Sequence, residues 1–109
     1  MNESQAIDAL GALAHQVRLR IIMHLIQCGD AGSAAGQIGD HVDAAPSKVT
    51  FHMASLEKAG LVSSTRKSRQ IIYRVNSEAM GGLLQYLLSD CCQNNAAIID
   101  CCSLRGCTE

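Results

Sequence analysis

Four of the six cysteines in this sequence form two adjacent pairs close to its C-terminal end, Cys91-Cys92 and Cys101-Cys102. Thiolates are soft ligands, and no histidine lies in this part of the sequence. Such a donor set favours trivalent arsenic or antimony over zinc, nickel or cobalt, which bind well to imidazole. We therefore expect a soft-ion site formed by Cys91, Cys92, Cys101 and Cys102.

The number of thiols that converge on one arsenic atom would decide which arsenical binds. Arsenite offers three bonding positions to thiolates, whereas a methylated or aryl species keeps one for carbon and needs two thiols. Neighbouring side chains on a helix diverge, so a pair can grip one atom only where the backbone leaves the helix. Residues 93–95, Gln-Asn-Asn, suit such a turn. A continuous helix would hold the pairs about 13 Å apart, so a two-thiol site on Cys101 and Cys102 alone stays an open alternative.

The other two cysteines are weaker candidates. We interpret Cys28 as a small buried hydrophobic residue at a helix end, and Cys107 lies near the end of the chain. A thiol oxidoreductase would need a Cys-x-x-Cys motif at a helix start in an α/β setting, which is absent from this sequence. We expect no enzyme activity and no catalytic cofactor. An iron–sulfur protein and a thiol–disulfide switch remain alternatives for four clustered cysteines.

Length and composition suit one small domain followed by a tail. We expect a domain over residues 1–90 and a cysteine-rich sensing tail over residues 91–109. No charged lead with a long apolar run opens the sequence, and no run of about 18 apolar residues occurs. We therefore expect a cytoplasmic protein with no membrane contact, in a compartment where thiols stay reduced.

The stretch over residues 45–62 predicts a helix that the other elements position. Pro46 suits a first helical residue, and Gly60 suits a left-handed helix end. One face is an apolar stripe of Val49, Met53, Leu56 and Ala59. The opposite face carries small hydroxyls, a cation and an aromatic ring, at Ser47, Lys48, Thr50 and Phe51. This pattern is typical of a helix that lies against phosphates and base edges in a major groove.

Three helices are expected before this recognition helix. Asn2 should cap the first helix with Gln5 as its returning partner, and Ile7, Leu10 and Ala14 form its apolar side. The second, over about residues 15–27, should supply the main core. Its apolar positions are Val17, Ile21, Ile22, Leu25 and Ile26. A short third helix over residues 32–42, with Ser33 as its cap, completes a helix-turn-helix unit.

A β-hairpin is expected after the recognition helix, over residues 61–75, with the basic tip Arg66-Lys67-Ser68-Arg69. The net charge of the chain is −1, but residues 44–75 carry six cations and one anion. The basic footprint of a nucleic-acid binder is therefore regional. The predicted fold class is mainly α with a small β-hairpin wing, a winged helix-turn-helix.

A last helix should begin after a cap at Asn76. Its broad apolar face is too large for so small a core to cover, so we expect it to pair with a second copy, helped by the first helix. That face consists of Met80, Leu83, Leu84, Leu87 and Leu88. The prediction is a homodimer formed through the first and last helices.

Two motifs resemble the ArsR/SmtB family of bacterial metal-responsive repressors. Residues 12–21, Ala-Leu-Ala-His-Gln-Val-Arg-Leu-Arg-Ile, resemble the family's Ala-Leu-Ala/Ser-His/Asp-Pro-x-Arg-Leu motif, with Gln16 in place of proline. Residues 47–62 resemble its recognition helix and the Ala-Gly-Leu-Val exit. Ala45 stands where the family has a capping Ser or Thr, a loss of about 1 kcal/mol of helix stability. The resemblance covers about residues 10–88.

The resemblance implies a repressor. In this family, the element that carries the metal-ligating residues determines which inducer binds. Two common family sites lack ligands here: the expected third helix has no Cys-x-Cys, and the last helix has no histidine. The tail-cysteine arsenic sensors of the family are the nearest type, with Cys91, Cys92 and one of Cys101 or Cys102 as the corresponding thiols. Other soft metals and thiol oxidation remain alternatives as the inducing signal.

The expected function follows from these parts. A homodimer would bind double-stranded operator DNA and leave it when trivalent arsenic, as arsenite or a methylated or aryl arsenical, or antimonite binds the tail. Phosphate contacts are expected from the four cations Lys48, Arg66, Lys67 and Arg69. Base contacts are expected from Ser47, Thr50 and Phe51.

Overall fold

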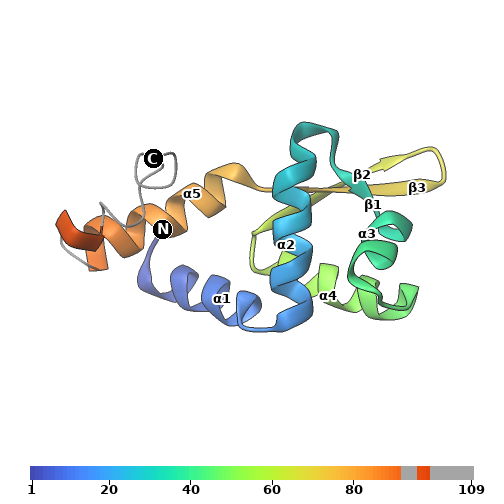
Figure 1. Cartoon of the computed structure of the whole chain (residues 1–109). Helices are drawn as coiled ribbons and strands as arrows, with labels where there is room; N and C mark the ends of the chain where they lie inside the picture. Colours follow the sequence, from blue (N-terminus) through green and yellow to red (C-terminus); the bar gives the residue numbers. More distant parts are fainter. Residues whose placement is uncertain (92–95, 99–109) are drawn as a thin grey trace.

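The computed structural model of the chain describes residues 1–91 and 96–98. Four helices, α1 (Glu3–Leu13), α2 (Gln16–Cys28), α3 (Ala35–Val42) and α4 (Pro46–Lys58), pack around one core, and the wing projects from one end (Figure 1). The wing consists of β2 (Val62–Lys67) and β3 (Gln70–Val75). Helix α5 (Ser77–Gln85) extends from the other end. The predicted winged helix-turn-helix fold is confirmed.

Side-chain caps mark the starts of α1 and α5. Asn2 accepts from the backbone N–H of Gln5 at 2.8 Å and donates its own N–H to the Gln5 side chain at 2.9 Å, so the predicted capping box is confirmed. Asn76 accepts from the N–H of Ala79 at 3.2 Å and caps α5 as predicted. Ala45 gives α4 no side-chain cap, and Pro46 is its first residue.

The predicted start of the third helix was wrong. Ser33 does not cap it. Instead, Ser33 and Ala34 form a short strand, β1 (Ser33–Ala34), antiparallel to β3, with Ser33 opposite Tyr73, and the sheet order is β1-β3-β2. Pairing with a strand far along the chain overrides the local signal. A Cβ at Gly32 would lie 2.6 Å from the Tyr73 carbonyl, so this close approach requires glycine.

The core confirms most of the predicted apolar positions and corrects four of them. Its largest buried side chains come from α2, α3, α4 and the residue before β2: Ile21, Ile22, Leu25, Ile38, Val49, Met53, Leu56 and Leu61. Ile26 is 53% exposed, contrary to prediction. Helix α1 buries Ala6, Ala9 and Ala12 instead of the predicted Ile7, Leu10 and Ala14, because small side chains let it pack closely on the core.

The far end of α5 departs from α-helical geometry. After Gln85 the chain continues as a π-helical turn over Tyr86–Cys91, which ends at the first cysteine of the tail. Leu83 is buried and Leu84 is 49% exposed. No helix among the described residues is long and apolar enough to cross a membrane. The predicted boundary between residues 90 and 91 stays a prediction.

Candidate nucleic-acid interface

Helix α4 presents the predicted face to solvent. Ser47, Lys48, Thr50 and Phe51 are all exposed, and the Phe51 side chain keeps 63% of its surface accessible. Val49 and Met53 on the opposite face are buried. Thr50 donates its hydroxyl to the Pro46 carbonyl at 3.0 Å. The first turn of α4 has no side-chain cap, so its N–H groups and the positive end of the helix dipole are available to a phosphate.

The wing tip adds cations beside this face. Arg66, Lys67 and Arg69 are exposed, and the hairpin turns between Lys67 and Gln70, which are paired across the strands. Arg74, the fourth cation of the hairpin, has a different role. Its Nε donates to the Asp30 carbonyl at 2.7 Å and its NH1 group donates to the Thr65 hydroxyl at 3.0 Å, so it ties β2 and β3 to the short 3-10 turn, Gly29–Ala31, that follows α2.

Nothing in the local sequence pattern singles out Arg18, but the structure places it against α4. Its Nε donates to Nδ1 of His52 at 3.1 Å, and its guanidinium lies 5.7 Å from the centre of the Phe51 ring. His52 is buried, so it packs within the fold and does not face solvent with Phe51. Arg18 and His52 each lie in one of the two stretches that resemble motifs of the family, and this is the sequence signal that could have pointed to them.

The charge state of His52 follows from this environment. Burial first, and then the charges of His15, Arg18 and Lys48, lower the pKa of His52 below the ordinary 6.5. His52 is therefore neutral at pH 7. Because Nδ1 accepts the hydrogen bond from Arg18, the ring proton lies on Nε2.

The predicted soft-ion site lies almost entirely outside the described residues. Cys92, Cys101 and Cys102 are not described, and only the backbone of Cys91 is. Cys28 is half-buried, with Sγ 3.6 Å from Nε2 of His24, whose ring stacks on His41 at 4.2 Å. Among the described residues, no group of three or more His, Cys, Asp or Glu side chains could hold a metal ion.

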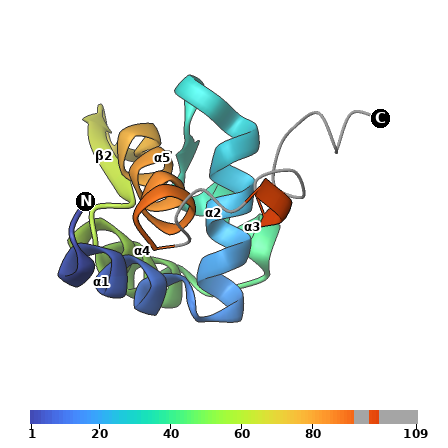
Figure 2. The same ribbon diagram turned by 90° about the vertical axis from the view of Figure 1, so that its left-hand side faces the viewer.

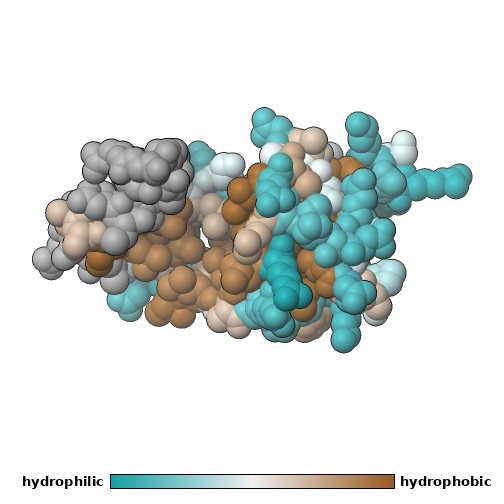
Figure 3. Space-filling view, viewed as in Figure 1, coloured by the Kyte–Doolittle hydropathy of each residue, from teal (hydrophilic) through white to brown (hydrophobic). Residues whose placement is uncertain are grey.

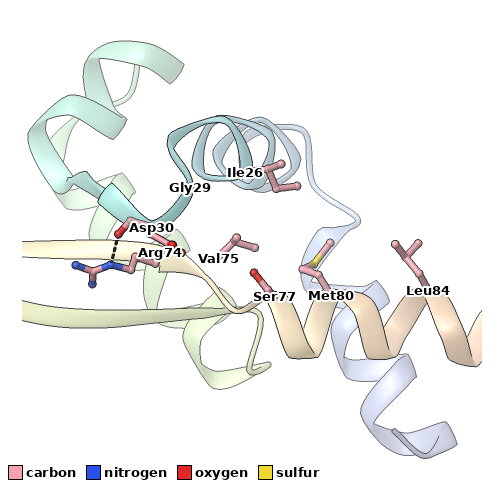
Figure 4. A pocket seen from close by; sticks show the side chains of 8 residues that line it. All are labelled: Ile26, Gly29, Asp30, Arg74, Val75, Ser77, Met80 and Leu84. Carbon is pink, nitrogen blue, oxygen red and sulfur yellow. Dashed lines mark hydrogen bonds between the residues drawn. The ribbon is translucent and has the colours of Figure 1, made fainter. Parts of the chain in front are cut away.

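An apolar groove of about 330 Å³ runs between the end of α2 and α5 (Figure 4). Ile26 lines it from α2, and Met80 and Leu84 line it from α5. The Arg74–Asp30 hydrogen bond lies at one end. Because Met80 and Leu84 belong to α5, the apolar lining of the groove continues the uncovered apolar surface of that helix.

The fold and the exposed face of α4 define a winged helix-turn-helix DNA-binding protein. A family model described as "Helix-turn-helix domain" matches residues 13–65. The chain is 30% identical over 88 residues to the HTH-type transcriptional regulator YgaV of Escherichia coli, covering 81% of this chain and 87% of YgaV. It is 35% identical over 94 residues to the HTH-type transcriptional regulator CmtR of Mycobacterium tuberculosis, covering 82% and 76% of the two chains.

Solved structures agree on the fold. An ArsR-like transcriptional regulator from Rhodococcus sp. RHA1 matches with a TM-score of 0.70 at 21% identity, covering 92% of this chain and 94% of that one. A structure titled "Possible transcriptional regulator for arsenical resistance" matches with a TM-score of 0.63 at 26% identity, covering 71% and 77%. This chain belongs to the ArsR/SmtB family of winged-helix transcriptional regulators.

Proposed function

We propose that this regulator is a homodimeric repressor that binds operator DNA through α4 and the wing and is released when a trivalent arsenical binds its tail thiolates. The observation that carries the DNA-binding half is the exposed polar face of α4 beside a basic wing tip, since Thr50 of α4 and Arg69 of the tip line the same surface pocket. Lys48, Arg66, Lys67 and Arg69 neutralise phosphates. Ser47, Thr50 and Phe51 meet base edges, with Phe51 suited to a thymine methyl group.

Uncovered apolar side chains on α1 and α5 support the dimer. Ile7 is 60% exposed, Leu10 is 42% exposed and Leu84 is 49% exposed. The two helices lie on the same side of the molecule (Figure 2), and apolar surface gathers over them (Figure 3). A winged helix-turn-helix protein of Mycobacterium bovis with the same fold, with a TM-score of 0.65 at 21% identity, is described as homodimeric. A second copy on this face would place two α4 helices in successive major grooves, about 34–36 Å apart.

The chemistry of the tail supports a soft ligand. Four thiols without a nearby histidine prefer trivalent arsenic or antimony to zinc. A relative from Streptomyces lividans, 29% identical over 93 residues and covering 84% of this chain and 70% of its own, is described as "Probable mercury resistance operon repressor". Together with the arsenical-resistance neighbour, this relative supports a soft metal or metalloid as the inducer.

A ligand panel tests the proposal. Wild-type protein would select a duplex from a random-sequence pool, and fluorescence anisotropy would follow its release by arsenite, methylarsenite, antimonite, zinc or hydrogen peroxide. We expect release by the trivalent arsenicals or antimonite and retention with zinc. Release by peroxide without arsenic would favour a disulfide switch instead. Release by zinc alone would contradict the soft-ion argument.

A further inference from the structure

The contact between α2 and α4 includes one polar link. In the part of the chain that the structure describes, the bond from Nε of Arg18 to Nδ1 of His52, at 3.1 Å, is the one hydrogen bond that joins these two helices. Arg18 lies on α2, while His52 and its neighbour Phe51 lie on α4. A residue outside the recognition helix therefore contacts two consecutive residues within it.

The acceptor of this bond is held rigidly. His52 is buried, and the His15 ring contacts it with ring centroids 4.6 Å apart. His15 is in turn fixed because its Nδ1 accepts from the backbone N–H of Val17 at 3.2 Å and caps α2. A fixed acceptor sets the direction of the Arg18 guanidinium, whose donors form a planar fork.

The guanidinium in turn limits the ring of Phe51. The 5.7 Å separation from the ring centre lies within cation–π range. The His52 ring meets Phe51 edge-on, with centroids 5.5 Å apart. Phe51 is otherwise the most exposed large apolar side chain among the described residues, and an exposed side chain without such contacts would occupy several rotamers.

We propose that Arg18 is a positioning residue for DNA recognition: held by His52, it fixes the Phe51 ring in one orientation on the exposed face of α4. The inference rests on the proposed binding of DNA through α4. Because the Phe51 ring is already fixed, DNA binding does not have to order a mobile side chain before the apolar edge of the ring meets a base. The arrangement therefore increases the discrimination between DNA sequences. The terminal nitrogens of Arg18 are not required to touch DNA in this role.

A double-variant cycle tests the route through Phe51. Binding would be measured on the duplex that the wild type selects and on a random-sequence duplex of equal length. We expect Arg18→Lys and Arg18→Gln to lower the preference for the selected duplex about tenfold, and we expect them to have little further effect in a Phe51→Ala background. Equal effects of the Arg18 variants with and without Phe51 would overturn the proposal.

The salt dependence separates positioning from a direct phosphate contact. With Arg18→Gln, the slope of log affinity against log salt should stay at the wild-type value. A reduction of the slope by about 0.9 would make Arg18 a phosphate contact and overturn the positioning role. Failure of the wild type to prefer any duplex would instead refute the proposed function itself.

The conservative variant of His52 provides a rescue. His52→Asn keeps an acceptor near the position of Nδ1 and should keep the sequence preference, whereas His52→Leu should lose it while still unfolding cooperatively. Retention of the preference with both variants would show that burial alone matters, and loss with both would show that an acceptor at this position is not sufficient; either result would contradict the proposal.

The pH dependence of the sequence preference distinguishes the hydrogen bond from packing, because packing alone would not change it. His52 faces Arg18 on α2, His15 at the start of α2 and Lys48 on its own helix. A proton on Nδ1 removes the acceptor, so acidification should reduce the preference of the wild type and of His15→Asn, but not that of His52→Asn. An identical profile for His52→Asn and the wild type would contradict the role of Arg18.

Discussion

The side chain of Asn76 donates through Nδ2 to the Gly60 carbonyl at 3.1 Å. The same residue caps α5, and its backbone N–H donates to the Leu61 carbonyl at 2.8 Å. Gly60 lies just beyond Ala59, the C-cap of α4, and has a positive φ of 81°. One residue therefore joins the exit of the recognition helix to the start of the helix that leads into the cysteine tail.

The variant Asn76→Ser tests whether this junction carries the inducer signal. Serine keeps a capping oxygen for the N–H of Ala79 but cannot reach Gly60 with a donor. We expect DNA affinity to stay within a few fold of the wild type and the arsenite-induced loss of affinity to become smaller, because allosteric coupling is typically about 1–3 kcal/mol. Anisotropy titrations with and without arsenite measure both quantities. Full release by arsenite with this variant would exclude the junction from the signal path.

The wing predicts a change in salt dependence. Replacing both Arg66 and Arg69 with Ala should flatten the slope of log affinity against log salt by about 1.8, because each phosphate contact contributes about 0.9. Arg74→Ala is the matched control, since Arg74 is held by Asp30 and Thr65. It should lower stability by about 1 kcal/mol and leave the slope unchanged. An unchanged slope in the double variant would remove the wing tip from the DNA interface.

Stability should depend on pH through two histidines. Burial is the main cause that lowers the pKa of both His24 and His52, with His41 adding to the effect at His24. The unfolded chain binds these protons near the ordinary value of 6.5, and the folded chain binds them only at lower pH. The contribution of the two histidines to the free energy of unfolding should therefore have its full value above about pH 6.5. It should decrease as the pH falls below that value.

Urea unfolding at about pH 7.5 and about pH 5.5, on either side of the ordinary histidine value, measures this loss. The double variant His24→Gln, His52→Asn lacks both groups and should lose less stability over the same interval. An equal loss in wild type and variant would assign the pH dependence to other groups.

The proposed dimer predicts that charges on α1 and α5 separate the protomers without unfolding them. Leu84 and Ile7 are exposed in the protomer, so Leu84→Lys combined with Ile7→Lys should shift sedimentation equilibrium towards the monomer at an unchanged circular dichroism spectrum. Met23→Lys is the control, because Met23 is 55% exposed on α2, outside the proposed interface. Dissociation by the control alone would move the interface to α2.

The parts of the fold that local chemistry determines were predicted correctly. The Asn2 and Asn76 caps, Pro46 at the start of α4 and the basic hairpin tip depend on residues close together in the sequence. Strand β1 was missed because Ser33 and Ala34 pair with β3, far along the chain. The buried face of α1 was missed because close packing selected its alanines over the larger Ile7 and Leu10.

The residues of the candidate site also fall into those that the sequence predicts and those that depend on the packing of distant elements. The exposed face of α4 follows from its apolar stripe, so Ser47, Lys48, Thr50 and Phe51 could be placed from the sequence. The contact of Arg18 with His52 depends on how α2 crosses α4, which no local pattern contains. The four tail thiols remain a prediction from chemistry, since Cys92, Cys101 and Cys102 lie outside the described residues.

Release of DNA by arsenite in matched cysteine variants tests the central proposal most directly. The variant with serine at Cys91, Cys92, Cys101 and Cys102 would be compared with Cys28→Ser, which changes a thiol within the folded domain. Both should bind the selected duplex like the wild type. Arsenite should then release Cys28→Ser and leave the tail variant bound. Unimpaired release of the tail variant by arsenite would contradict sensing by the tail.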